Sequence, residues 1–194
     1  MKRIVVASNN RGKLREIAAL LGDSFELVAQ ADLDVPEADE TGLTFVENAI
    51  LKARNAAHHT GLPAIGEDSG LEVDALAGAP GIYSARFSGA GASDQSNNEK
   101  LLQQLDGVNR RGARYRTVAV YLRHAADPAP LICAGTWEGS ITEQPTGDGG
   151  FGYDPLFVPV GADHTAAQMS AAEKNRVSHR ARALDQLAKA LHAG

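Results

Sequence analysis

Apolar residues at the start of the chain follow the spacings of a strand, a helix and a second strand. The run Ile4–Ala7 predicts a buried strand within Lys2–Ala7. Apolar residues then recur at helical spacing and predict a helix over about Lys13–Leu21, which Gly22 ends. The residues Glu26–Ala29 predict the next strand. The chain is therefore expected to begin as strand, helix and strand.

Further along, capping boxes of the form Ser/Thr-x-x-Glu mark three helix starts. The expected helices run from Thr44 to about Thr60, from Ser96 to about Leu105, and from about Ala171 to Leu191 with Ser170 as its cap. The expected strands are a short one near Ala64–Gly66 and a hairpin of Tyr115–Arg123 with Leu131–Glu138. The stretch EDSG, residues 67–70, has the composition of a turn.

Strands and helices interleave at both ends of the chain, whereas the middle has an antiparallel pattern. This order predicts an α/β domain with a mixed β-sheet flanked by helices. The 194 residues fit a single domain, 1–194, without internal repeats or a linker. Ligands of such sheets usually lie beyond the carboxyl ends of strands, and the stretch SNNRGK, residues 8–13, occupies such a position.

Charge and cysteine content exclude some classes of protein. The net charge of −5 argues against a protein that coats nucleic acid, although it allows a local basic pocket for a small anion. The single cysteine, Cys133, cannot form an intrachain disulfide. The first apolar run has only four residues, too few for a signal peptide or a membrane helix. We therefore expect a soluble cytoplasmic protein with neither a membrane nor a nucleic-acid partner.

The stretch SNNRGK has the features of a phosphate-binding turn. A strand-to-helix turn presents backbone N–H groups and the positive end of a helix dipole, while Gly12 allows close approach and Lys13 adds a charge. It is no Walker A loop, because Leu14 stands where Ser or Thr would hold Mg²⁺. An Asn-capped helix start with solvated cations explains the same residues.

Acidic residues offer ligands for a hard cation. Glu40 lies in an acidic loop, and Glu67 and Asp68 follow a short strand, where neighbouring side chains point in opposite directions. Mg²⁺ commonly uses one or two carboxylates together with substrate phosphates and water, and Glu40 and Asp68 could supply them. A turn and a solvated acidic loop are the structural alternative.

Two further stretches could bind a base and phosphates. Gly147–Pro155 combines four glycines with Phe151 and Tyr153, which could stack on a purine, and with Asp154, which could accept from ring N–H groups; a glycine-rich hairpin explains it as well. The last helix carries basic residues beside an apolar stripe, and these could equally be a solvated face. Together, the four stretches specify a nucleotide phosphate, a cation and a base.

The blocks that carry these features resemble, in order and across nearly the whole chain, those of the inosine/xanthosine triphosphate pyrophosphatases. The blocks are SNNRGK, ETGLTFVENAILKA (40–53), EDSGLEVDAL (67–76), GAPGIYSAR (78–86), GGFGYDPLF (149–157) and SHR (178–180). The resemblance implies hydrolysis of dITP, ITP and XTP to the monophosphate and pyrophosphate. It also implies a homodimer and an elongated mixed sheet, with an active-site cleft between two lobes.

The same resemblance implies roles for individual residues. Asp68 would be the proton acceptor and a Mg²⁺ ligand, and Glu40 a second metal contact. Glu67 stands where many relatives have Asp, so it is left out of the ligand set. Substrate contacts would come from Ser8, Asn9, Asn10, Arg11, Gly12, Lys13, Ser69, Phe151, Gly152, Tyr153, Asp154, Lys174, His179 and Arg180.

Three other functions fit the residues. One is a pyrophosphatase for other modified nucleotides, such as methylated triphosphates. A second is a nucleotide sensor that binds without turnover, and a third is a phosphatase that releases single phosphates. A substrate panel with identification of the products separates all of them.

Overall fold

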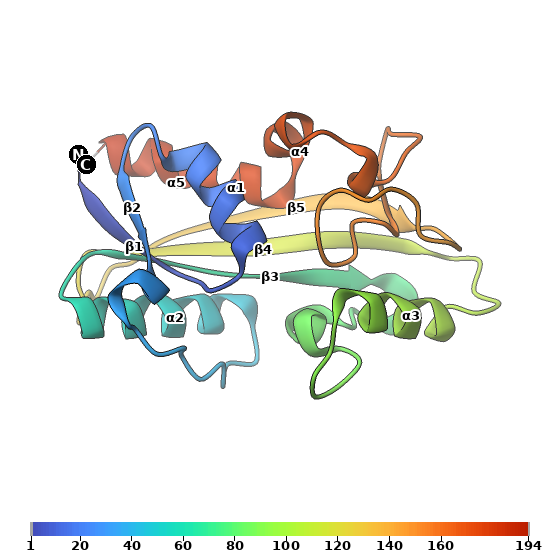
Figure 1. Ribbon diagram of the computed structural model, residues 1–194, viewed down its shortest axis with the longest axis horizontal. Coiled ribbons are helices and arrows are strands. Elements are labelled where there is room, and N and C mark those ends of the chain that lie inside the picture. Colours follow the sequence, from blue (N-terminus) through green and yellow to red (C-terminus); the bar gives the residue numbers. More distant parts are fainter. Residues whose placement is uncertain (1, 194) are drawn as a thin grey trace. The chain divides into compact units, whose positions relative to one another are not determined.

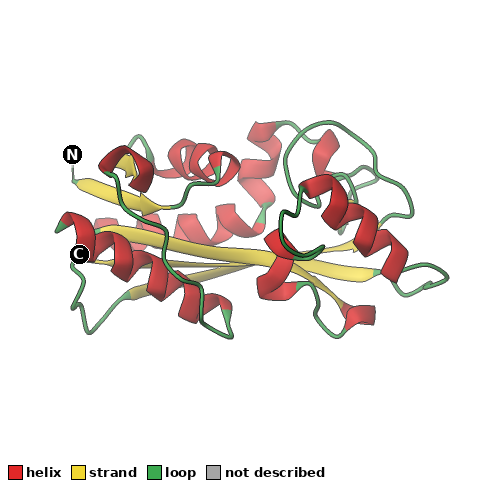
Figure 2. Cartoon of the chain, turned by 60° about the horizontal axis from the view of Figure 1, so that its bottom comes forward, coloured by secondary structure: helices red, strands yellow, loops and turns green. Residues whose placement is uncertain are grey.

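The computed structural model describes residues 2–193, which form a six-stranded sheet flanked by helices (Figures 1 and 2). The strand order is β2-β1-β3-β4-β5-β6. The strands are β1 (Arg3–Ala7), β2 (Glu26–Ala29), β3 (Ala64–Val73), β4 (Gly112–Leu122), β5 (Leu131–Ile141) and β6 (Phe157–Pro159). The helices are α1 (Arg11–Leu21), α2 (Phe45–Thr60), α3 (Asp94–Gln104), α4 (Ala171–Val177) and α5 (His179–Ala193).

The sheet is mixed, as the sequence predicts. Strand β1 pairs in parallel with β2 and with β3, so that Val5 lies opposite Val28 on one side and opposite Ala64 on the other. Strands β5 and β6 are antiparallel, with Ser140 opposite Val158. The prediction of an α/β fold with helices on a mixed sheet is confirmed.

The chain divides into two compact units. Unit 1 contains residues 1–68, 117–135 and 179–194, and unit 2 contains residues 69–116 and 136–178. The residues of β3, β4 and β5 are divided between the two units. Each unit has its own apolar core and its own cluster of polar side chains.

In unit 1, the strand β1 separates two apolar layers. Ile4 and Val6 pack with Ile17 of α1 and Leu184 of α5, whereas the alternate residues of β1 pack with α2. Figure 1 shows this arrangement, with α1 and α5 on one side of β1 and α2 on the other. Because side chains of a strand alternate between its faces, the continuous apolar run of β1 fits burial on both sides.

Small residues let helices approach the sheet of unit 1 closely. The face of α2 toward the sheet consists of Ala49, Ala53 and Ala56, all of which are fully buried. A Cβ atom at Gly135 of β5 would lie 2.0 Å from the carbonyl oxygen of His179, at the start of α5. Glycine at position 135 is therefore what allows the backbone of α5 to pack on β5.

Unit 2 has a core that is richer in aromatic residues. Tyr115 and Trp137 of the sheet pack with Phe157, and the ring centroids of Tyr115 and Phe157 are 4.8 Å apart. Leu101 of α3 and Leu71 of β3 belong to the same apolar cluster, so α3 packs on the sheet through this core. This core holds both α3 and the glycine-rich segment before β6.

Among the differences from the sequence-based prediction, three change an element near the predicted site residues. Strand β3 runs through residues 67–70, which the sequence predicts to be a turn. Helix α3 begins at Asp94 with a capping box of Ser93 and Ser96, so the predicted box at Ser96 is wrong. The last helix is broken at Ser178, whose ψ of 162° is extended. The prediction of one continuous helix from about Ala171 to Leu191 is therefore wrong, because α4 ends at Val177 and α5 begins at His179.

Within residues 2–193, none of the helices has the length and apolar character that crossing a membrane requires.

We expect Gly135→Ala to lower the free energy of unfolding by about 1–3 kcal/mol, the usual cost of overpacking a core. The added methyl group would meet the backbone of α5. The neighbouring residue Ala134 is exposed, and Ala134→Ser is the control, with an expected change within about 0.5 kcal/mol. Urea unfolding measures both variants, and equal stabilities would show that α5 does not pack tightly on β5.

Candidate functional site

The turn between β1 and α1 is held by its own asparagines. The side-chain oxygen of Asn10 caps α1 and accepts from the backbone N–H groups of Gly12 at 2.9 Å and Lys13 at 3.1 Å. The side chain of Asn9 donates to Glu37 at 2.7 Å and accepts from Gln30 at 3.1 Å. Two amides of the predicted phosphate-binding turn therefore already have an acceptor, and the turn has a defined shape.

The Lys13 side chain belongs to a buried ion network. The network consists of Lys13, Glu16, Glu67, Thr117 and Arg180. The Lys13 Nζ atom lies 2.9 Å from Oε2 of Glu67, and the Arg180 guanidinium lies 3.1 Å from Oε1 of the same carboxylate. Glu16 also pairs with Arg180, and the Thr117 hydroxyl donates to Glu67. Glu67 thus joins a cation of α1 to a cation of α5.

Burial alone would raise the pKa of Glu67, but the surrounding groups reverse this effect. The charges of Arg180 and Lys13 and the hydrogen bond from Thr117 hold the pKa of Glu67 well below its ordinary value. Both Glu67 and Arg180 are almost fully buried, with about 1% of each side chain exposed. A buried charge of this kind needs its partners, so Glu67 serves as the counterion of the network.

Asp68 points to the opposite face of β3, toward α2. Its Oδ1 atom lies 2.8 Å from Nζ of Lys52, and the same ammonium group lies 2.7 Å from Oε1 of Glu40. Asn48 donates to the other oxygen of Asp68 at 3.4 Å. These four residues, Glu40, Asn48, Lys52 and Asp68, form the carboxylate cluster of unit 1.

Burial controls the protonation of the carboxylate cluster. It raises the pKa of Asp68, and the nearby charges of Lys52 and Lys13 offset only part of this increase. Burial by itself would lower the pKa of Lys52, but Asp68 and Glu40 raise it above its ordinary value. Asp68 therefore keeps more proton affinity than an exposed aspartate, next to a lysine that stays charged.

The carboxylate cluster meets the minimum that a magnesium site requires of a protein. Glu40 and Asp68 both contact one ammonium nitrogen, which shows that their oxygens can surround a single cation position. No group of three or more His, Cys, Asp or Glu suited to a metal occurs among residues 2–193. Mg²⁺ often binds proteins through only one or two carboxylates and takes its other ligands from substrate phosphates and water.

In unit 2, residues 151–154 form a loop that is held by its own aspartate. One oxygen of Asp154 accepts from the backbone N–H of Phe151 at 3.0 Å and pairs with Nζ of Lys174 at 2.5 Å. The other oxygen accepts from the Tyr115 hydroxyl at 3.2 Å. Asp154 thus ties the 151–154 loop to α4 and to β4.

The two aromatic residues of this loop have different surroundings. Tyr153 is buried in the core of unit 2, and its hydroxyl donates to the Ser84 carbonyl at 2.8 Å. Phe151 is only partly buried, and Nζ of Lys174 lies 4.6 Å from the centre of its ring. Phe151 is therefore the aromatic ring of the loop that a flat ligand could reach most easily.

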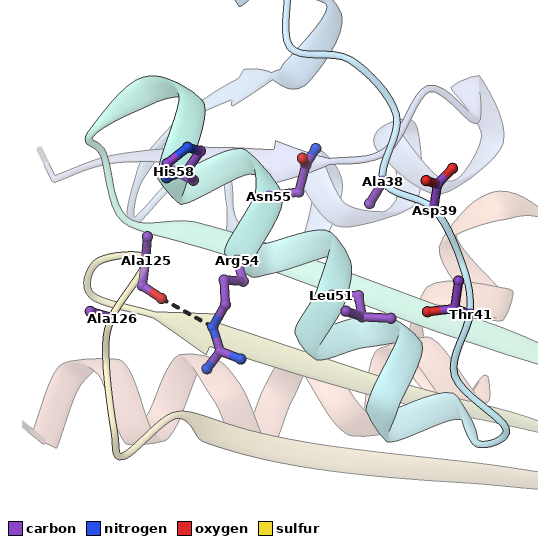
Figure 3. Close-up of a pocket in the computed structure, with 9 residues that line it drawn as sticks. All are labelled: Ala38, Asp39, Thr41, Leu51, Arg54, Asn55, His58, Ala125 and Ala126. Carbon is purple, nitrogen blue, oxygen red and sulfur yellow. Dashed lines mark hydrogen bonds between the residues drawn. The ribbon is translucent and has the colours of Figure 1, made fainter.

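An open groove of about 680 Å³ lies along another face of α2 in unit 1 (Figure 3). Arg54 crosses it and donates through Nε to the Ala125 carbonyl at 3.0 Å, while Asn55 donates to Pro36. The lining residues are Ala38, Asp39, Thr41, Leu51, Arg54, Asn55, His58, Ala125 and Ala126. The groove contains no pair of carboxylates with a shared cation, so the carboxylate cluster is the better candidate for chemistry.

The predicted site residues thus fall into two groups. Unit 1 contains Ser8, Asn9, Asn10, Arg11, Gly12, Lys13, Glu40, Asp68, His179 and Arg180, whereas unit 2 contains Ser69, Phe151, Gly152, Tyr153, Asp154 and Lys174. The expectation that Glu67 and Asp68 face opposite ways is confirmed by their separate partners.

Sequence reasoning missed Lys52 and Asn48 of the carboxylate cluster. They lie four residues apart in α2, and this spacing of polar residues beside a face of alanines was the signal that could have indicated them. It also missed Glu16 and Thr117 of the ion network. Thr117 is 50 residues from Glu67 in the sequence, and no local pattern connects the two.

Comparisons with known proteins agree on one family. The sequence model of the Ham1 family matches residues 4–190. The dITP/XTP pyrophosphatase of Shigella flexneri is 57% identical over 197 residues, and the alignment covers all of both chains. The dITP/XTP pyrophosphatase of Thioalkalivibrio sulfidiphilus is 58% identical over 94% of each chain. The structure of a HAM1 protein from Coxiella burnetii superimposes with a TM-score of 0.92 at 46% identity, with complete coverage of both chains.

We expect Glu67→Gln to lower the free energy of unfolding by about 3–5 kcal/mol, because it removes the buried carboxylate that Lys13 and Arg180 share and leaves Glu16 to balance Arg180. Glu26→Gln is the matched control, since Glu26 pairs with Arg3 at the surface and such pairs contribute about 1 kcal/mol or less. Urea unfolding at neutral pH compares the variants. A Glu67→Gln protein as stable as the Glu26→Gln protein would contradict the role of Glu67 as counterion.

Proposed function

Because the chain belongs to the Ham1 family, we propose that it hydrolyses dITP, ITP and XTP to the nucleoside monophosphate and pyrophosphate. Such an enzyme removes deaminated purine nucleotides before they enter DNA or RNA. Two of the relatives, from Shigella flexneri and Thioalkalivibrio sulfidiphilus, are named dITP/XTP pyrophosphatases and match over nearly their whole length. The proposal treats residues 1–194 as one catalytic domain that acts as a cytoplasmic homodimer, in line with the family resemblance.

The observation that carries the proposal is the meeting of Glu40 and Asp68 on one cation. We propose that these two carboxylates hold Mg²⁺, because hard oxygen ligands suit this ion and a triphosphate supplies further oxygens. When bound, Mg²⁺ neutralises phosphate charge and stabilises the charge that develops on the leaving pyrophosphate.

The role proposed for Asp68 is to orient the attacking water and to accept its proton. Burial raises the pKa of Asp68, whereas a bound Mg²⁺ would lower it, so the proposal gives Asp68 the orientation of the water as its main task. Asn48 and Lys52 hold the carboxylate in one orientation. Hydrolysis at the α-phosphorus then releases pyrophosphate as one product.

The cations near the β1–α1 turn would bind the phosphates. Lys13 keeps a partly exposed side chain, with 16% of it accessible, whereas Arg180 is buried in the ion network. The proposal assigns the Lys13 side chain and the turn of residues 8–12 to direct phosphate contact, apart from the Gly12 amide, which already donates to Asn10. Arg180 and His179 would complete the substrate contacts in unit 1.

The 151–154 loop of unit 2 would recognise the base. Phe151 offers a ring face, and Lys174 neutralises Asp154 while lying over that ring. Hypoxanthine and xanthine have a 6-oxo group where adenine has an amine, so a donor aimed at this oxygen would be left unpaired by ATP. Guanine shares the 6-oxo group, and its rejection must therefore depend on its 2-amino group.

We expect Asp68→Asn to lower kcat for ITP by about 10²-fold or more while KM changes by no more than about threefold, because the asparagine keeps the shape but not the proton acceptor. Asp185→Asn on the exposed face of α5 is the control and should leave kcat unchanged. Steady-state release of pyrophosphate measures both variants. Near-normal turnover by Asp68→Asn would rule out this role.

We expect ITP, dITP and XTP to exceed ATP in kcat/KM by a factor of roughly 10⁴, the discrimination that an unpaired buried donor can provide. GTP and dGTP should also be cleaved much more slowly. The assay uses Mg²⁺ and identifies the product of each nucleotide. Orthophosphate as the product would indicate a phosphatase, binding without any product would indicate a sensor, and faster cleavage of methylated triphosphates would indicate a different pool enzyme.

A further inference from the structure

Helix α3 contacts the 151–154 loop of unit 2 through two hydrogen bonds to the backbone of Gly152, one to its N–H and one to its carbonyl. The backbone N–H of Gly152 donates to Oδ2 of Asp94 at 2.7 Å, and the Gly152 carbonyl accepts from Nδ2 of Asn98 at 3.0 Å. Asp94 and Asn98 are four residues apart and therefore lie on one face of α3.

This double contact fixes a residue that has unusual backbone freedom. Gly152 has a φ of 64°, in the left-handed region, and glycine adopts many other conformations at little cost. Its two neighbours are Phe151 and Tyr153. A rotation of the Gly152 backbone would therefore move the Phe151 ring and redirect the N–H group of Tyr153.

The contact also determines which backbone donors of the loop remain available. Phe151 donates to Asp154, Gly152 donates to Asp94, and the N–H of Asp154 donates to the Phe151 carbonyl at 3.3 Å. Within the part of the chain that the structure describes, the N–H of Tyr153 donates no hydrogen bond to another protein group. Of the four loop amides, that of Tyr153 is therefore the one without a protein acceptor among the described residues.

We propose that Asp94 and Asn98 form a positioning clamp on the base-recognition loop, an inference that rests on the function proposed above. The clamp holds Gly152 in its left-handed conformation. In this state the Phe151 ring and the Tyr153 N–H keep the orientation in which a 6-oxopurine meets them. The clamp acts through the loop, so Asp94 and Asn98 are positioning residues and touch no reacting atom.

The direct test measures the rate of hydrogen exchange at the Gly152 amide by NMR. Asp94→Ala/Asn98→Ala should speed this exchange by about tenfold or more, because the amide loses its charged acceptor and the loop its second anchor. Asp94→Asn, which keeps an acceptor oxygen, should restore most of the protection. Gln95→Ala is the matched control, since the exposed Gln95 side chain donates to Glu99 on the same helix, and its removal should leave exchange at the Gly152 amide unchanged.

The second readout is steady-state hydrolysis of ITP and ATP by the same variants. We expect the double variant to raise KM for ITP by about tenfold with kcat within about threefold, and to narrow the preference for ITP over ATP. Circular dichroism and thermal unfolding establish that α3 remains folded.

The outcomes separate the clamp from the proposed function. Unchanged Gly152 exchange in the double variant overturns the clamp, whether or not the enzyme hydrolyses ITP. Faster exchange with an unchanged KM for ITP shows that the clamp does not serve base recognition and overturns the proposal. If the wild-type protein fails to hydrolyse ITP, the proposed function is wrong, and the exchange experiment still decides whether the clamp exists.

Discussion

Two neighbouring carboxylates on a buried strand impose the main constraint on unit 1. Glu67 and Asp68 face opposite sides of β3, and each needs cations because a buried carboxylate without partners is strongly unfavourable. Lys13 and Arg180 meet this need on one face, and Lys52 meets it on the other. The positions of α1, α2 and α5 on the sheet are therefore fixed by charge as well as by apolar packing.

The division of roles between these two carboxylates follows from their surroundings. Glu67 has its pKa held low by fixed cations and a hydroxyl donor, which makes it a permanent anion with a structural role. Asp68 has its pKa raised by burial and shares the Lys52 ammonium group with a second carboxylate, Glu40, and this difference is the basis of the separate role proposed for it. In the same way, unit 2 separates a buried tyrosine that anchors the 151–154 loop from a phenylalanine that remains accessible.

The sequence predicts much of the fold, because the periodicity of β1, α1, α2, β4 and β5 reports burial directly. It fails at residues 67–70, where turn-forming residues lie inside a strand. Their partners Thr117 and Arg180 are 50 and 113 residues away from Glu67, so local propensity could not indicate them. The sequence motifs likewise indicated residues of the ion network and of the carboxylate cluster. The charged side chains that orient them, such as Lys52, could be identified only from the structure.

Lys52, which bridges Glu40 and Asp68, affects how the chain can fold in the absence of a metal ion. Two acidic groups intended for a divalent ion would repel one another in its absence, and many small metal sites depend on their ion in order to fold. Here a covalently attached ammonium already balances that charge. Newly synthesised chains can thus reach the native state before any ion arrives, and under the function proposed above a cell short of magnesium would retain a folded but inactive protein.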